Sequence, residues 1–250
     1  MHLILTGATG LVGSAALDAM IRAKDISKIS IISRRPVPMA DDAKDPRINV
    51  IIHKDFNNFD SAILDQLKDA HGCVWALGIS QTKVSKEDYV AITKDYTLAA
   101  AESFSKLATA EKPFRFVYVS GEGASQTPGR FSPIFARVKG ETETALSDMM
   151  KTHPSLRADS VRPAFVDNAK HEAIKPYVPD AGFIYNAAKG VLGPVMRSMA
   201  GRHSPTEELG DYLTQLAMGK QDAGLASSGA YQLGSSWIVP NVAFRKAIGL

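Results

Sequence analysis

The chain has 250 residues, of which 45% are hydrophobic and 22% are charged, and its formal net charge is +3. A chain of this length can bury a full hydrophobic core, and its composition is ordinary for a soluble globular protein. The small, dispersed charge argues against nucleic acid and acidic membranes as partners, and no apolar run approaches the length of a membrane span. We therefore expect a soluble, cytoplasmic protein.

The single cysteine, Cys73, excludes an intrachain disulfide framework and fits a reducing compartment. It lies in the apolar run CVWAL, where we expect a buried structural thiol. The six histidines show no spacing typical of metal ligands. We therefore expect no metal site.

Short β-rich apolar runs alternate with longer amphipathic segments through the first two thirds of the chain. The alternation predicts an α/β protein with a doubly wound parallel sheet, the Rossmann fold. The strand runs are almost continuously apolar, as in strands that are covered on both faces. The expected strands are 2–6, 28–33, 48–53, 73–77, 114–120 and 156–162, and the expected helices are about 11–23, 59–70, 86–110 and 133–152.

Beyond the sixth expected strand the pattern becomes looser. We expect a helix at about 182–200, and SPTEE predicts another helix, with Ser204 as its cap and Pro205 in its first turn. A strand near 231–234 and a short terminal helix complete the expected elements. The whole chain, 1–250, is then one domain, and its irregular part, 163–250, covers the substrate beyond the carboxyl ends of the strands.

The first expected strand runs directly into TGATGLVGS, and a helix is expected next. Glycines at this spacing let backbone N–H groups and the positive end of the helix approach a pyrophosphate. The alternative is a bare turn, but the preceding strand and the following helix are the context that a dinucleotide site requires. The loop residues expected to contact the cofactor are Thr6, Gly7, Thr9, Gly10, Leu11, Val12 and Gly13.

The ends of the later strands indicate which dinucleotide is bound. Ser33, Arg34 and Arg35 stand where a carboxylate would bind the ribose hydroxyl of NAD, and the arginines suit the 2′-phosphate of NADP(H). The alternative is a pair of solvated arginines. Asp55 is expected to accept a hydrogen bond from the adenine amino group, although solvation of its loop explains it almost as well. The strand-end residues expected to pass over the cofactor are Ala76, Leu77 and Gly78.

Four motifs together resemble the short-chain dehydrogenase/reductase superfamily, in its extended or atypical branch and close to the NmrA-like group. TGATGLVG is similar to the phosphate loop of that branch, and VYVSGEGAS to its fifth strand with an active-site serine at Ser120. VKGETE is similar to the helix that carries the lysine, here Lys139, and VRPAFV to the Arg162–Pro163 pair of the sixth strand. The resemblance covers at least residues 2–166. It implies a Rossmann fold that binds NADP(H), with Ser120, Lys139 and Pro163 beside the cofactor.

In that family a Tyr-x-x-x-Lys pair carries the chemistry. The tyrosine gives a proton to the substrate oxygen, the lysine lowers the tyrosine's pKa and holds the ribose, and the serine orients the carbonyl. In this chain the tyrosine position is Phe135, whose ring has no proton to give. Lys139 is expected to contact the ribose, the alternative being a pair with Glu143, and Ser120 is expected in the active site, the alternative being a local hydrogen bond.

General acid catalysis contributes ~10² to 10⁴ in rate, so three resolutions of the missing tyrosine stay open. Another donor gives the proton, from among Ser120, Tyr185, Tyr177 and Tyr89, which makes Ser120, Lys139 and Tyr185 the candidate catalytic residues. The cofactor instead serves a reaction that needs little acid help, such as reduction of a charged iminium or a non-redox isomerisation or cyclisation. Or the protein binds NADP(H) and signals without catalysis. The leading hypothesis is NADPH-dependent reduction of a carbonyl or imine in a small organic substrate.

Overall fold

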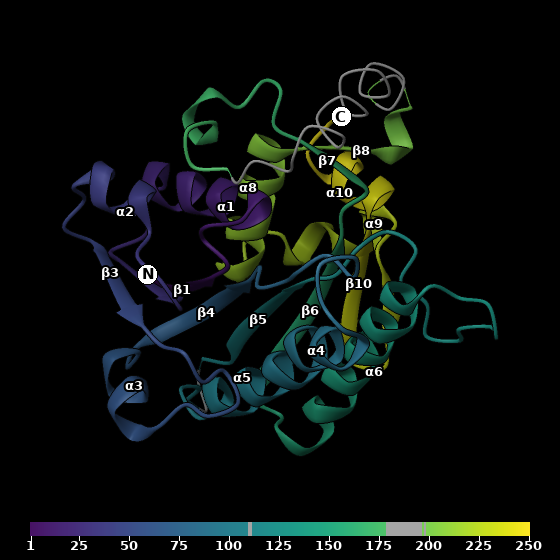
Figure 1. Ribbon diagram of the computed structural model, residues 1–250, viewed down its shortest axis with the longest axis horizontal. Helices are drawn as coiled ribbons and strands as arrows, with labels where there is room; N and C mark the ends of the chain where they lie inside the picture. Colours follow the sequence, from purple (N-terminus) through teal and green to yellow (C-terminus); the bar gives the residue numbers. More distant parts are fainter. Residues whose placement is uncertain (110–111, 179–196, 198) are drawn as a thin grey trace.

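The computed structural model describes residues 1–109, 112–178, 197 and 199–250, which form a sheet between two layers of helices (Figure 1). The expectation of a doubly wound, mostly parallel sheet is confirmed. Within the described chain, β9 is antiparallel to β10 and the other neighbouring strands of this sheet are parallel. The strands, in spatial order, are β3 (Ile48–Ile52), β2 (Lys28–Ser33), β1 (His2–Thr6), β4 (Ala70–Trp75), β5 (Phe114–Val119), β6 (Leu156–Arg162), β10 (Ser236–Pro240) and β9 (Tyr231–Leu233).

Alternate residues of each central strand enter two separate hydrophobic cores. Leu3 and Leu5 of β1 pack under α1 and α8, whereas Ile4 packs on the opposite face with the layer formed by α5 and α6. Figure 1 shows α1 and α8 on one side of the sheet and α4, α5 and α6 on the other. The longer helices are α1 (Leu11–Arg22), α5 (Tyr96–Ser105), α6 (Ile134–Thr152) and α8 (Thr206–Ala217). The shorter ones are α2 (Pro38–Ala43), α3 (Ser61–Gln66), α4 (Lys86–Val90), α9 (Leu225–Ser228) and α10 (Asn241–Ala247), with a π-helical turn at Ala91–Asp95.

The predicted cap at Ser204 is wrong by one position. Pro133 and Pro205 are the residues that precede the first helical residue of α6 and α8, and both are extended, since a proline ring fixes φ but leaves ψ free. Ser204 instead lies in a short strand, β8 (His203–Pro205), which pairs with β7 (Phe165–Asp167). Its hydroxyl donates to the side-chain oxygen of Asn241 at 2.6 Å and accepts from the amide of Ala164 at 2.9 Å.

The carboxyl-terminal part does more than cover the sheet. β10 extends the sheet beside β6, and α8 packs directly on α1. A Cβ on Gly210 of α8 would lie 2.3 Å from the carbonyl oxygen of Ala15, so only glycine allows this close crossing. The expected short terminal helix corresponds to α10, and the expected helix at 182–200 lies almost wholly outside the described residues. None of the described helices is long and apolar enough to cross a membrane.

Candidate cofactor and substrate cleft

The phosphate loop connects β1 to α1 and is shaped by glycine. Gly7 has φ +71°, and a Cβ there would lie 2.2 Å from the carbonyl oxygen of Ala76 at the end of β4. A Cβ on Gly13 would lie 2.0 Å from the carbonyl oxygen of Gly7, while the amide of Gly10 donates to that same oxygen at 2.8 Å. The first turn of α1 is uncharged, so its free backbone N–H groups present the positive end of the helix at the carboxyl edge of the sheet.

The end of β2 is tied to this loop. One terminal guanidinium nitrogen of Arg35 donates to Oγ1 of Thr9 at 3.1 Å. The Ser33 hydroxyl donates to the carbonyl oxygen of Arg35 at 2.7 Å, which holds the turn after β2. Arg34 and Arg35 are both exposed. They face a cavity of about 410 Å³, the adenosine-side cavity, which is lined by Gly7, Thr9, Ile32, Ser33, Arg34, Arg35, Phe56 and Leu77.

Asp55 is placed differently from the expectation for an adenine contact. It is exposed and does not line the adenosine-side cavity, and its Oδ1 accepts from the backbone amide of Asn57 at 3.1 Å. Its neighbour Phe56 is 1% exposed and does line that cavity. Phe56 was not predicted from the sequence, although an aromatic residue in the loop after a strand can stack against a base.

A second cavity, of about 490 Å³, adjoins the first and shares Leu77 with it. It lies over the carboxyl ends of β1, β4, β5 and β6, at the point where the strand order reverses, which is where open α/β sheets bind ligands. The predicted site residues that line it are Gly10, Leu11, Val12, Ala76, Leu77, Gly78, Ser120, Lys139 and Pro163. We call this second cavity the reaction cleft.

Ser120 and Lys139 meet at the floor of the reaction cleft. The Ser120 hydroxyl is buried and has no hydrogen-bond partner among the described residues. Nζ of Lys139 donates to the carbonyl oxygens of Ser120 at 2.5 Å and Val119 at 3.3 Å. Burial lowers the pKa of Lys139 to about 8, against the opposing pull of the Glu143 carboxylate.

The alternative of a hydrogen-bonded pair between Lys139 and Glu143 does not occur. Glu143 is fully buried and accepts instead from Arg162 of β6, at 2.8 Å and 2.5 Å, and from the Gln126 side chain at 2.6 Å. Since Arg162 neutralises Glu143, Lys139 is left to bind backbone oxygens at the rim of β5.

Phe135 lines the reaction cleft one helical turn before Lys139. Its amide donates to the side-chain oxygen of Gln81 at 2.9 Å, which fixes the start of α6. Its ring tip lies 3.5 Å from the position a Cβ on Gly123 would take. The ring therefore occupies the wall of the cleft and offers no proton.

The other predicted proton donors do not share this position. The Tyr177 hydroxyl donates to Asp42 at 2.8 Å, and Tyr177 lines a different cavity together with Thr9 and Arg35. Tyr89 is 2% exposed and does not line the reaction cleft. Tyr185 lies outside the described residues.

Four polar residues that line the reaction cleft were not predicted from the sequence: Ser80, Thr93, Tyr118 and Glu122. Tyr118 lies near the end of β5, and burial raises the pKa of its hydroxyl. Glu122, the second residue after Ser120, is exposed and lines the cleft. The run VSGEGAS already placed Glu122 beside the predicted active-site serine, which was the available signal.

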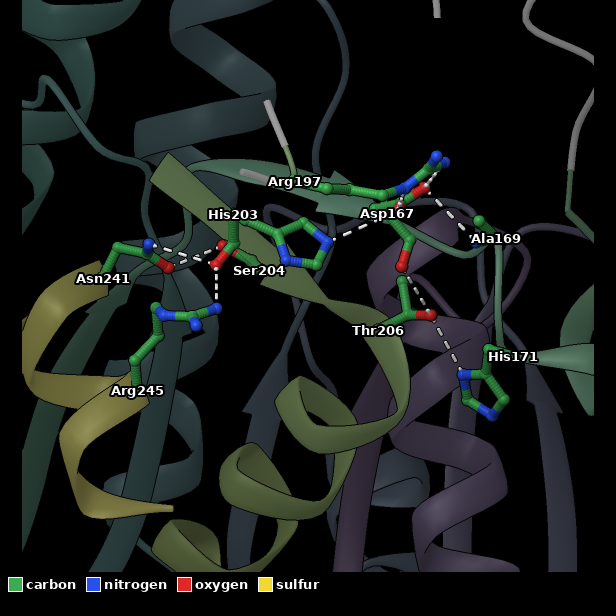
Figure 2. Close-up of polar contacts among 9 residues, drawn as sticks. All are labelled: Asp167, Ala169, His171, Arg197, His203, Ser204, Thr206, Asn241 and Arg245. Atoms are coloured by element: carbon green, nitrogen blue, oxygen red, sulfur yellow. Dashed lines mark hydrogen bonds and ion pairs between the residues drawn. The ribbon is translucent and has the colours of Figure 1, made fainter. Parts of the chain in front are cut away.

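A polar network surrounds the paired strands β7 and β8, which follow Pro163 and precede α8 (Figure 2). Asp167, at the end of β7, accepts from Nε of Arg197 at 2.6 Å and contacts Nε2 of His203 at 3.4 Å. The ring of His171 lies 3.0 Å from the Thr206 hydroxyl and 3.2 Å from the carboxylate of Asp18 on α1. These contacts join the ends of β7 and β8 to each other and, through His171, to α1 and α8.

The known proteins that are similar to this chain include two sequence relatives and a solved structure. The chain is 43% identical over 155 residues to botcinic acid biosynthesis cluster B protein 16 of Botryotinia fuckeliana, which covers 61% of this chain and 98% of that protein. It is 34% identical over 238 residues to leucinostatins biosynthesis cluster protein T of Purpureocillium lilacinum, which covers 87% of this chain and 85% of that protein. L-sorbose reductase from Gluconobacter frateurii, complexed with NADPH and L-sorbose, has a similar fold, with a TM-score of 0.64, 16% identity and coverage of 96% and 95%. No family model matches the chain.

Proposed function

We propose that the chain is a member of the short-chain dehydrogenase/reductase superfamily, in its extended or atypical branch, that binds NADP(H) and reduces a small organic molecule. The observation that carries the proposal is the pair of adjoining cavities, which leads from the phosphate loop and Arg35 to Ser120 and Lys139. The names of the two fungal relatives, both biosynthesis-cluster proteins, support a small organic substrate.

The residues present fit the dinucleotide. The glycine loop and the uncharged start of α1 suit the pyrophosphate, and Arg34 and Arg35 suit a 2′-phosphate. The described lining of the adenosine-side cavity contains no carboxylate that would select the free ribose hydroxyl of NAD. When bound, the cofactor would supply a hydride.

Ser120 and Lys139 are the residues we propose to act on cofactor and substrate. The unpartnered hydroxyl of Ser120 is free to bond a substrate atom, since the described chain gives it no other partner. Lys139 can hold the ribose with the N–H that does not bond the strand carbonyls. Phe135 forms part of the cleft wall and has no hydroxyl that could donate a proton to the substrate.

The test is NADPH consumption by the purified protein with a panel of small carbonyl and imine compounds, followed through the absorbance of the reduced nicotinamide. We expect turnover with at least one class and a loss of ~10²-fold or more for Ser120→Ala combined with Lys139→Met, at unchanged fold. No consumption with any compound, despite tight NADPH binding, would contradict the reductase assignment.

A second candidate is a non-redox isomerisation or cyclisation with the dinucleotide bound. Phe135 favours it, because a site without the tyrosine has lost the proton donor that carbonyl reduction uses in this superfamily. In the same assay this candidate predicts product formation while the NADPH absorbance stays constant.

A further inference from the structure

We propose that the reaction cleft takes a cationic substrate, an iminium group, which the Glu122 carboxylate binds by charge and the Phe135 ring binds by its face. The inference rests on the proposed function and names its substrate class. It joins two residues of one cleft that the family pattern does not explain.

The proton balance of the reaction favours an iminium over a ketone. Hydride addition to a carbonyl carbon leaves an alkoxide, which needs a proton from the protein or from water. Hydride addition to the carbon of C=N⁺ sends the π pair to nitrogen and gives a neutral amine, so no proton is required. A cleft in which Phe135 replaces the acid is therefore matched to an iminium and mismatched to a ketone.

Glu122 places a carboxylate at the rim of the reaction cleft. Its backbone amide donates to the carbonyl oxygen of Pro163 at 2.8 Å, which fixes the residue at the rim of the reaction cleft. One carboxylate oxygen accepts from the amide of Asn241 at 3.1 Å, and in the described part of the chain no lysine or arginine forms an ion pair with Glu122. The nearby Arg162 is already paired with Glu143. Glu122 therefore lines the cleft with a carboxylate that accepts from the backbone amide of Asn241, the first residue of α10, and forms no ion pair in the described chain.

Glu122 and Lys139 are the charged side chains among the described residues that line the cleft. Two of the three N–H groups of Lys139 donate to the carbonyl oxygens of Val119 and Ser120, and the third is left for the cofactor ribose. Of the two side chains, Glu122 is therefore the one whose charge attracts a substrate cation.

The Phe135 ring offers an aromatic face to a cation in the cleft. Cations bind the faces of aromatic rings with about 0.5–2 kcal/mol, depending on how dry the site is. Phe135 is half-buried, held at its amide by Gln81, and exposed to the reaction cleft. An iminium between this ring and Glu122 would meet a π-face and a carboxylate, which is the arrangement that separates a cation from a neutral molecule of the same shape.

The experiment compares a cation with its neutral isostere in the dinucleotide-bound protein. Choline and 3,3-dimethylbutan-1-ol have the same shape, and neither can accept hydride, so binding is measured by NMR titration without turnover. N-methyl-3,4-dihydroisoquinolinium and α-tetralone then form the reactive pair. The variants are Glu122→Gln, whose amide oxygen can still accept from Asn241, and Phe135→Leu, with Glu102→Gln of α5 as a control that removes an exposed charge elsewhere.

We expect choline to bind at least 10-fold more tightly than the alcohol, and the iminium to be reduced at least 10-fold faster than the ketone. Glu122→Gln should remove most of the choline preference and raise the KM of the iminium at unchanged NADPH affinity. Phe135→Leu should reduce the choline preference several-fold, and Glu102→Gln should leave both preferences intact. Equal binding of choline and the alcohol, or a choline preference that survives Glu122→Gln, would overturn the inference alone. A wild-type protein that does not bind NADPH would overturn the proposed function together with it.

Discussion

At the scale of single residues, the feature that matters most is Phe135, which has no hydroxyl where the family pattern has a tyrosine. Phe135 occupies the wall of the reaction cleft one turn before Lys139, so the helix keeps the family's geometry and loses its acid. The sequence predicted this departure, because the four-residue spacing to Lys139 could be counted. Glu122 was not predicted as a cleft residue, although it stands two positions after the predicted active-site serine. Its contacts with Pro163 and Asn241, which are distant in the sequence, hold it at the rim of the cleft.

Restoring the tyrosine tests whether the rest of the catalytic geometry is intact. We expect Phe135→Tyr to raise the reduction of neutral ketones by about 10-fold or more, because the new hydroxyl would lie near Lys139 and Ser120. The measurement is kcat/KM for a ketone and for an iminium in parallel. Phe135→Leu serves as the control, and an unchanged ketone rate in an otherwise active enzyme would show that the proton comes from elsewhere.

Because Lys139 is buried, we expect the unfolding free energy of the protein to depend on pH. Burial lowers its pKa from the ordinary 10.5 to about 8, so between these pH values the unfolded chain holds a proton that the folded chain has lost. The unfolding free energy of the wild type, relative to Lys139→Met, should therefore rise from pH 8 to pH 10.5. Chemical denaturation across this range measures the difference. The exposed Lys24→Met provides the reference, and a flat difference for Lys139→Met would contradict the buried ammonium.

At the scale of elements, α6 positions the reaction cleft. It carries Phe135, Lys139 and Glu143 on successive turns, and the buried pair of Glu143 with Arg162 joins it to β6. Gly140 lets the helix approach the loop after β5, because a Cβ there would lie 1.9 Å from the carbonyl oxygen of Ser125. The position of α6 thus depends on a contact that only glycine permits.

We expect Gly140→Ala to destabilise the protein by about 1–3 kcal/mol, since the added methyl group would force α6 and the Ser125 loop apart. Urea unfolding measures this loss, and NADPH titration shows whether the shift reaches the cleft. Gly224→Ala is the matched control, because a Cβ at Gly224 meets nothing within 4 Å. Equal stability of the two variants would refute the role of this contact.

The central elements could be predicted from sequence because their signals are local. Strands β1, β2 and β6 have the expected bounds, and in β1 and β2 isoleucine and leucine recur along a short segment. The pairing of β7 with β8 could not be predicted, because it joins three-residue segments about forty positions apart. The starts of α6 and α8 shifted by one residue, because an extended Pro133 or Pro205 can precede a helix as readily as begin it.

At the scale of the whole molecule, one edge of the sheet gathers the site. Seven parallel strands of the described chain end there, and the two adjoining cavities follow that edge from the end of β2 to the end of β6. The sequence predicted this edge through the Rossmann pattern. It could not predict what reaches over it from the carboxyl-terminal part, where long-range polar bonds such as those of Asp167 and His203 set the path of the chain (Figure 2).

The central claim is that this edge binds NADP(H) through the arginines that follow β2. The most direct test is calorimetric titration of NADPH and NADH into the wild type, the Arg34→Ala/Arg35→Ala variant and the control Arg130→Ala, an exposed arginine on another loop. Hydrogen bonds to charged groups contribute about 1.5–3 kcal/mol each, so the wild type should prefer NADPH by at least about 10-fold. The double variant should lose most of that preference and keep its NADH affinity. Equal losses for both dinucleotides, or no preference in the wild type, would contradict the account.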